Sequence, residues 1–260
     1  MPSPTDFNVS PYYDDFSEAK NFHRILFRPA FAVQARELTQ SQTLLQNQIE
    51  KFSDHMCKPG AMVLPGQLSI DTNYYAVKLT SKSASSLNDY LNTTMTGGTS
   101  GLTATVIKVS ATDGTDPDTL FVKYTKTGTN NTATVFSDGE TLTSSGAGSP
   151  TVVVDTTATG SAAAVEAGTY YINGFFVGVT AQTLILEKYS NEPNFRVGLT
   201  ITETFVTSTD DTSLLDNAQG SSNENATGAH RFKIDLTLAK LAPDSTADAS
   251  FIELMRVEEE

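Results

Sequence analysis

The sequence contains no tryptophan, a single cysteine and three histidines, and these shortages exclude several classes of protein. Because Cys57 is alone, no intramolecular disulfide can form, so the chain is not a disulfide-stapled secreted scaffold. His23, His55 and His230 lack metal-ligand spacing, and His55 and Cys57, two residues apart, point away from each other on a helix. We therefore expect no zinc site. We expect Cys57 to be a packed or surface thiol, because no local signature supplies a catalytic base.

Long hydrophobic runs and positive charge are also scarce. No apolar stretch approaches the roughly 18 residues that cross a membrane, and no basic region followed by an apolar run opens the chain. We expect neither a membrane span nor a signal peptide. The chain has 17 Lys and Arg against 30 Asp and Glu, which gives a net charge of -13. This acidity argues against a nucleic-acid binder and against docking on an anionic membrane, and it favours solubility.

Motifs for catalysis or for cofactor binding are missing as well. The run DGTDPD at 113–118 offers three aspartates but lacks the calcium-loop pattern, so an acidic turn is the simpler interpretation. The three aspartates between 210 and 216 have no companion motif of a glycosidase. No Gly-rich stretch follows a strand and opens a helix, which argues against nucleotide binding. We expect no enzyme activity, no cofactor and no catalytic or metal-ligating residue.

The strongest pattern in the chain predicts one long helix from about Val33 to Met56, about 24 residues or about 36 Å. Apolar residues recur at a 3–4 spacing through nearly four heptads, which is typical of a helix that packs along a seam. Pro59-Gly60 ends the helix. We interpret the seam as an oligomer interface formed by Phe31, Ala35, Leu38, Gln42, Leu45, Ile49, Phe52 and Met56.

Two features of this seam concern its partner. The positions that flank it carry no charge, so the usual salt-bridge code for partner choice is missing; they are Thr39, Gln46 and Ser53 on one side and Gln34, Ser41 and Gln48 on the other. Gln42 places an amide in the middle of the seam, where a buried amide needs a hydrogen-bond partner. A symmetry-related Gln42 would serve in a homo-oligomeric bundle. The alternative is a lone helix packed on a sheet of its own chain, with Gln42 at the edge.

Residues 1–30 are expected to form an extended arm, because four prolines interrupt the segment and remove backbone donors. The segment is too aromatic for a solvated tail. We infer that the arm lies either on its own β domain or on a neighbouring subunit. The residues expected to make partner contacts through the arm are Tyr12, Tyr13, Phe16 and Phe22.

From Ala61 onward the hydrophobic period becomes that of strands. We expect a mainly β fold, antiparallel and sandwich-like, with one long N-terminal α-helix and an inserted small β subdomain. Asn173-Gly174 is a strong hairpin signal because both positions accept positive φ. The expected strands are 61–64, 73–80, 102–110, 119–126, 132–136, 151–155, 169–172, 175–179, 183–189, 195–207, 230–241 and 251–257. The expected parts are an arm at 1–30, a packing helix at 31–60, a β domain of 61–80 plus 161–260, and an inserted subdomain at 81–160.

A long polar loop at 208–229 carries the apolar pair Leu214 and Leu215. Loops of this length are usually functional or ordered by a partner. We therefore count Leu214 and Leu215 among the residues expected to contact a partner.

Two stretches resemble a known family. Residues 22–66 contain Ala35-Arg36-Glu37-Leu38 leading into the glutamine-rich helix, and residues 194–236 contain Ser213-Leu214-Leu215-Asp216-Asn217 followed by the polar loop. Both resemble the N-terminal domain of a family of tailed-bacteriophage virion proteins, found at the head of tail-fibre and baseplate-associated chains. The resemblance covers 88 of the 260 residues and leaves out 81–160, in agreement with an insertion.

The resemblance implies a structural subunit of a phage tail, in the baseplate or at the attachment of a tail fibre. Such a protein is located in the virion and made in the host cytoplasm. The resemblance also implies a homo-oligomer, with a trimer favoured, and contacts with other tail or baseplate proteins. No nucleic acid and no membrane partner is expected.

Two other functions stay open from the residues alone. A carbohydrate-binding or adhesin module that recognises host-surface glycans would stack sugars on exposed tyrosines, for which the candidates are Tyr74, Tyr75, Tyr170 and Tyr171. An enzyme such as a depolymerase would release reducing sugar from envelope polysaccharide. The family resemblance is the main reason to favour assembly over both.

Overall fold

The computed structural model describes residues 4–129, 131–246 and 248–258, and the chain divides into two compact units. Unit 1 combines the N-terminal part up to Leu68 with Val165–Gln182 and Arg196–Met255. Unit 2 combines Ser69–Ala164 with Thr183–Phe195 and the C-terminal residues from Arg256. Each unit is therefore built from segments that lie far apart in the sequence.

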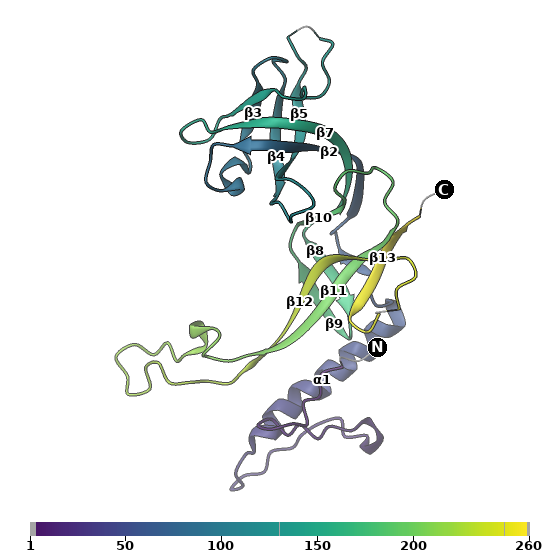
Figure 1. Ribbon diagram of the computed structural model, residues 1–260. Helices are drawn as coiled ribbons and strands as arrows, with labels where there is room; N and C mark the ends of the chain where they lie inside the picture. Colours follow the sequence, from purple (N-terminus) through teal and green to yellow (C-terminus); the bar gives the residue numbers. More distant parts are fainter. Residues whose placement is uncertain (1–3, 130, 247, 259–260) are drawn as a thin grey trace. The chain divides into compact units, whose positions relative to one another are not determined.

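The fold is mainly β, with antiparallel strand pairs and one α-helix near the N-terminus, which confirms the expected class (Figure 1). No helix in the described ranges is both long enough and apolar enough to cross a membrane. In chain order the helix and strands are α1 (Ala35–Met56), β1 (Met62–Leu64), β2 (Leu68–Lys82), β3 (Thr94–Gly97), β4 (Thr103–Ser110), β5 (Thr119–Lys126), β6 (Thr141–Ser144), β7 (Thr151–Val165), β8 (Gly168–Ile172), β9 (Phe175–Val179), β10 (Gln182–Glu187), β11 (Phe195–Val206), β12 (Arg231–Leu241) and β13 (Phe251–Val257).

Helix α1 begins at Ala35, two residues later than the pattern predicts, because Gln34 acts as its N-cap. The Gln34 side chain accepts from the backbone of Glu37, and Glu37 Oε2 accepts from the Gln34 backbone N–H at 2.9 Å. This reciprocal pair satisfies backbone donors that the first helical turn leaves open. The helix therefore starts at a defined residue, which fixes the register of its seam.

Unit 1 contains two three-stranded sheets, β1-β8-β9 and β12-β11-β13. The turn between β8 and β9 is the expected hairpin, with positive φ at Asn173 (47°) and Gly174 (89°). Strands β11 and β12 pair without interruption from Arg196–Leu241 to Val206–Arg231 and form a long ribbon that ends in the loop after Val206 (Figure 1). A Cβ on Gly198 would lie 2.0 Å from the Ile252 carbonyl oxygen, so the close approach of β11 and β13 requires glycine there.

Unit 2 is organised around a seven-stranded sheet in the order β10-β7-β2-β5-β4-β3-β6. Since β6 also pairs with β7, six of these strands close on themselves around an apolar core. Tyr90 is fully buried in that core, and its hydroxyl donates to the Thr151 carbonyl at 2.9 Å. The segment expected as an insertion, 81–160, lies inside this unit.

The strand expected at 132–136 is wrong, because this segment is irregular. Phe136 is buried there, but its backbone N–H donates to the Tyr124 hydroxyl at 3.0 Å instead of joining a strand ladder. The short strands β3 and β6 were not predicted, because their sequences contain too few apolar residues. Each contributes one large apolar side chain to the core, Met95 and Leu142, which is too little to produce a strand pattern.

Glu140 is a buried carboxylate that organises two turns of unit 2 by accepting from backbone N–H groups. Oε1 accepts from the backbone N–H groups of Thr99 (2.8 Å) and Ser100 (2.5 Å), and Oε2 accepts from that of Ser137 (3.1 Å). Burial opposes the charged form, but the backbone hydrogen bonds outweigh it and lower the pKa of Glu140. The stability that Glu140 contributes is therefore present above its unfolded pKa and is lost as pH falls through the lower folded pKa.

We predict that Glu140→Gln destabilises unit 2 by about 1–2 kcal/mol at pH 7, because an amide nitrogen would face backbone donors. The variant should also lose less stability than the wild type on acidification below about pH 4.5. Urea unfolding, followed by hydrogen exchange at the amides of β3 and β6, measures the effect. The control is Asp138→Asn on the same turn, where the side chain is exposed and makes no described hydrogen bond. An equal effect in both variants would contradict the role of Glu140.

Candidate interaction surface

Helix α1 attaches to its own chain through its polar face. Arm residues 14–18 lie along this face: Asp14 accepts from the hydroxyl of Thr43, Asp15 Oδ1 accepts from Gln40 Nε2 at 3.1 Å, and Glu18 accepts from Asn47 and pairs with Lys51 at 3.3 Å. Asp14 is buried to 5% exposure by these contacts. The arm thus lies on its own chain here, and it occupies the side of α1 that would normally face water.

The C-terminal half of α1 is held by the β8–β9 hairpin. The Tyr171 hydroxyl donates to Asp54 Oδ1 at 2.7 Å, and Gln46 Nε2 donates to the Gly174 carbonyl at 2.6 Å. Burial and then the hydrogen bond to Asp54 raise the pKa of Tyr171, so this hydroxyl stays protonated and keeps donating. These bonds fix α1 on unit 1 without using its apolar side.

The predicted seam lies on the opposite side of α1 and is uncovered. All of its members are exposed in the described chain, and Leu45, Phe52 and Met56 reach 68%, 70% and 67%. The remaining members are Phe31, Ala35, Leu38, Gln42 and Ile49. The seam therefore does not pack on a sheet within the described part of its own chain, which was the alternative interpretation. An apolar helix face of this length that faces solvent marks an interaction site.

The charges of α1 are kept away from the seam. Arg36, Glu37, Glu50, Lys51 and Asp54 all fall outside the seam and outside its flanking positions. A chain with a net charge of -13 repels its own copies, and this repulsion is smallest where the facing surfaces are neutral. The seam itself therefore adds no charge repulsion to a contact between copies.

A groove of about 930 Å³ extends the apolar surface beside the N-terminal half of the seam. Its α1 wall includes Leu38 and Gln42, which also belong to the seam, and its other wall is aromatic. Phe7 of the arm packs edge-on against Phe205 and Phe232, with centroid distances of 5.8 and 5.0 Å. Phe7 was not among the functional residues predicted from the sequence, although its position in the aromatic arm could have indicated it.

The arm residues expected to contact a partner are divided between two environments. Tyr12 lies on its own ribbon, with its ring 5.0 Å from Phe205 and its hydroxyl 2.7 Å from His230 Nδ1. Phe16 is half-buried beside α1, whereas Tyr13 and Phe22 are exposed. In the polar loop, Leu214 and Leu215 are half-buried, and Leu215 forms a single β-bridge with Thr227.

Exposed apolar side chains are concentrated at the start of the chain. Of the 18 large hydrophobic residues that are exposed in the described part, 15 lie between Val9 and Leu64. This segment contributes the seam, strand β1 and the stretch from Phe22 to Val33. Exposure on this scale in one segment, when the rest of the chain hides its apolar residues, indicates a surface made for protein contact.

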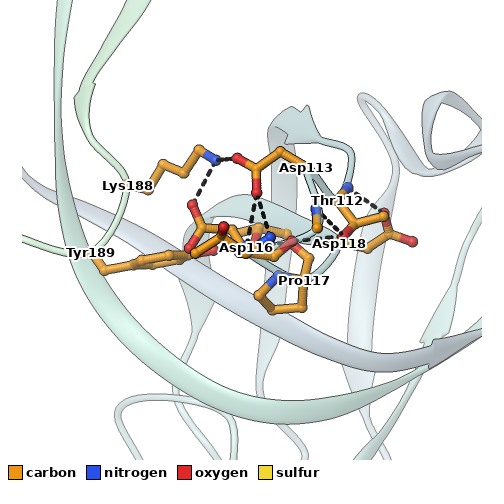
Figure 2. Close-up of polar contacts among 10 residues, drawn as sticks. Thr112, Asp113, Asp116, Pro117, Asp118, Lys188 and Tyr189 are labelled. Carbon is orange, nitrogen blue, oxygen red and sulfur yellow. Dashed lines mark hydrogen bonds and ion pairs between the residues drawn. The ribbon is translucent and has the colours of Figure 1, made fainter.

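The acidic turn at 113–118 forms ion pairs with a lysine of a distant segment. Lys188 Nζ donates to Asp113 Oδ2 at 2.9 Å and to Asp116 Oδ2 at 2.7 Å, as Figure 2 shows. Asp113 Oδ1 also accepts from the backbone of Thr115 and Asp116, and these bonds together with Lys188 hold the pKa of Asp113 well below its usual range. The turn thus connects the β4–β5 hairpin to the end of β10, which is a structural role.

No group of three or more His, Cys, Asp or Glu side chains within the described ranges is arranged to hold a metal ion. The aspartates of the polar loop each cap backbone of their own loop: Asp210 accepts from Thr207, Asp211 from Ser213, and Asp216 from Ala218. Local hydrogen bonds therefore fix the positions of these carboxylates within the loop.

The tyrosines proposed to stack on sugars are not exposed, so that expectation is wrong. Tyr74, Tyr170 and Tyr171 are buried in the cores of their units, and burial raises the pKa of Tyr74 to about 12. Tyr75 is half-buried against the edge of the Tyr124 ring at 5.1 Å. At these positions β2 and β8 are buried or half-buried on both faces.

We predict that Asp14→Ala loosens the arm from α1, because Thr43 and Gln40 lose their shared acceptor and the Phe16 N–H loses its cap. One or two lost bonds of about 1 kcal/mol each should raise amide exchange in residues 12–18 by about tenfold. Hydrogen exchange read by mass spectrometry measures this rate. Asp6→Ala, which removes only a local bond to the Asn8 N–H, is the control. Unchanged exchange in Asp14→Ala would show that the arm is held by other contacts.

Comparison with protein-family models finds a match to the family described as Domain of unknown function (DUF4815), over residues 10–112 and 114–258. No curated protein and no solved structure matches the chain. The family match spans residues of both units, but the description of the family names no activity.

Proposed function

Because this chain belongs to the DUF4815 family, a domain of unknown function, its geometry has to carry the functional argument, and we propose that it is a structural subunit that assembles through α1 and the N-terminal arm. The observation that carries the proposal is the seam of α1, whose members are all exposed while the polar side of the same helix is used inside the chain. A helix of a self-contained globular protein instead buries its apolar face and exposes its polar face.

The energetics of burial favour self-association through this surface. Each large apolar side chain of the seam is worth about 1.5–3 kcal/mol when it leaves water, and α1 is already held in place by Tyr171 and the arm, so little ordering entropy opposes the gain. Around a symmetry axis, each Gln42 amide can donate to the carbonyl of the next copy. We propose a homo-oligomer, with three copies favoured.

The setting that we propose is a bacteriophage tail, where the protein would serve in the baseplate or at tail-fibre attachment and contact other tail proteins. This part of the proposal is supported by the resemblance of residues 22–66 and 194–236 to virion proteins. It agrees with a part that is held together by interface burial and needs no cofactor.

Native mass spectrometry of the purified chain over a range of concentrations tests the proposal. We expect one discrete oligomer, three chains in the favoured case, that persists in high salt because the seam is uncharged. A mass of one chain at all concentrations would overturn the proposed function.

A further inference from the structure

Charge is unevenly distributed along unit 1. From residue 19 to residue 36 the chain has four basic residues and no acidic one, in a protein whose net charge is -13. From residue 197 to residue 230 it has five acidic residues and neither Lys nor Arg. These stretches correspond to two exposed features, which we name the basic segment (residues 20–31) and the acidic loop (residues 207–229).

The basic segment combines unpaired cations with exposed apolar side chains. Lys20 and Arg24 make no ion pair within the described ranges, and Arg28 only covers the ring of Phe31 at 4.1 Å. Phe22, Leu26 and Phe27 are 64%, 75% and 53% exposed. A surface of this composition fits a partner that offers carboxylates next to a few apolar groups.

The acidic loop offers this chemistry. Asp210, Asp211, Asp216 and Glu224 make no ion pair in the part of the chain that the structure describes, and each accepts from backbone N–H groups of the loop itself. For Asp210 and Asp211 these bonds lower the pKa, which favours the charged form. The half-buried Leu214 and Leu215 supply apolar surface between the acidic residues.

The two features do not satisfy each other within one chain, since no described hydrogen bond or ion pair joins residues 20–31 to residues 207–229. We propose that the basic segment of one chain binds the acidic loop of a second copy. This inference rests on the proposed self-association, which brings the two surfaces together at equal number and high effective concentration. The contact is heterologous, so around a rotation axis each basic segment meets the acidic loop of the next copy and the ring closes.

Zero-length carbodiimide cross-linking tests the contact, because it couples a lysine amine only to a carboxylate in direct contact. An equal mixture of natural-abundance and ¹⁵N-labelled chains should give mixed-isotope peptides that join Lys20 to an acidic residue of the loop. Lys20→Arg is the matched control, since it keeps the charge and the assembly but removes the reactive amine. Cross-linked peptides of one isotope only, or none at Lys20 in an oligomeric sample, would overturn the proposal.

Charge reversal separates this contact from the seam. Arg24→Glu/Arg28→Glu and Asp210→Lys/Asp211→Lys should each weaken association about tenfold at low salt, and the four changes together should restore it. Failure of rescue while the wild type stays oligomeric would sink the inference and leave the proposed function standing. A monomeric wild type would sink both. Cosedimentation with anionic vesicles that depends on Arg24 and Arg28, without the cross-link, would assign the segment to a membrane and overturn the proposal.

Discussion

Replacing Leu45 and Ile49 with aspartate is expected to convert the assembly into single chains without unfolding α1. Both side chains are exposed in the isolated chain, so the substitution costs the monomer little. The bonds that hold α1 on the β8–β9 hairpin, from Tyr171 to Asp54 and from Gln46 to Gly174, are untouched. In the assembly, however, two carboxylates would enter an apolar interface, and two buried aliphatic side chains would be lost from each copy.

The expected loss is at least about 3 kcal/mol per interface, which weakens association more than a hundredfold. Light scattering gives the mass, and circular dichroism checks that the helix content is unchanged. Ser41→Asp/Gln48→Asp adds the same two charges at flanking positions of the same helix and should change the mass far less. An unchanged mass for the Leu45/Ile49 variant would remove α1 from the interface.

Arg196→Ala is expected to cause the largest loss of stability in unit 1. The Arg196 side chain is 8% exposed; its Nε donates to Glu253 Oε2 at 2.5 Å, and its Nη1 donates to Asp248 Oδ1 at 2.8 Å and to the Ser245 carbonyl at 2.7 Å. The guanidinium connects β11 to β13 and to the turn before β13. Its removal takes a cation away from Glu253, which is itself partly buried.

Because Glu253 and Asp248 are partly exposed, we discount the value typical of a fully buried pair and expect a loss of about 2–4 kcal/mol. Urea unfolding with hydrogen exchange at the amides of β11 and β13 measures it. Lys233→Ala is the control, since it breaks an exposed ion pair with Asp235 on the neighbouring strand and should cost less than about 0.5 kcal/mol. Equal losses in the two variants would contradict a special role for Arg196.

The arrangement of α1 explains why these two predictions belong together. In most globular proteins an amphipathic helix buries its apolar face at home and presents charge to water. Here the carboxylates of Asp14, Asp15 and Glu18 occupy the polar face. The β8–β9 hairpin holds the helix, and its strand β9 contacts β12 of the sheet that contains Arg196. The apolar face stays exposed, which is the surface that the proposed assembly uses.

The seam could be predicted from the sequence because a 3–4 apolar period is a local property of the helix. The polar attachments of α1 could not, because no sequence rule pairs Asp14 with Thr43 or Tyr171 with Asp54 before the fold brings them together. Strands with strong alternation or an Asn-Gly turn, such as β8 and β9, were likewise predictable.

Burial on both faces was the property that the sequence concealed. Tyr74 and Tyr170 were candidates for exposed tyrosines, yet both rings are enclosed by their own units. Short strands such as β3, with one core residue, depend on their neighbours and carry no signal of their own. Conversely, hydrophobic residues such as Leu26 and Phe27 would be expected inside the protein, yet the structure shows both of them exposed.

The central claim is that the seam of α1 is buried between copies of the chain, and hydroxyl-radical footprinting measures this directly. We expect Phe52 and Met56 to be protected in the wild type above its association concentration, and to react freely in Leu45→Asp/Ile49→Asp. Phe176, which is exposed away from the seam, should react equally in both and serves as the internal reference. Equal reactivity of Phe52 and Met56 in the two proteins would contradict the account.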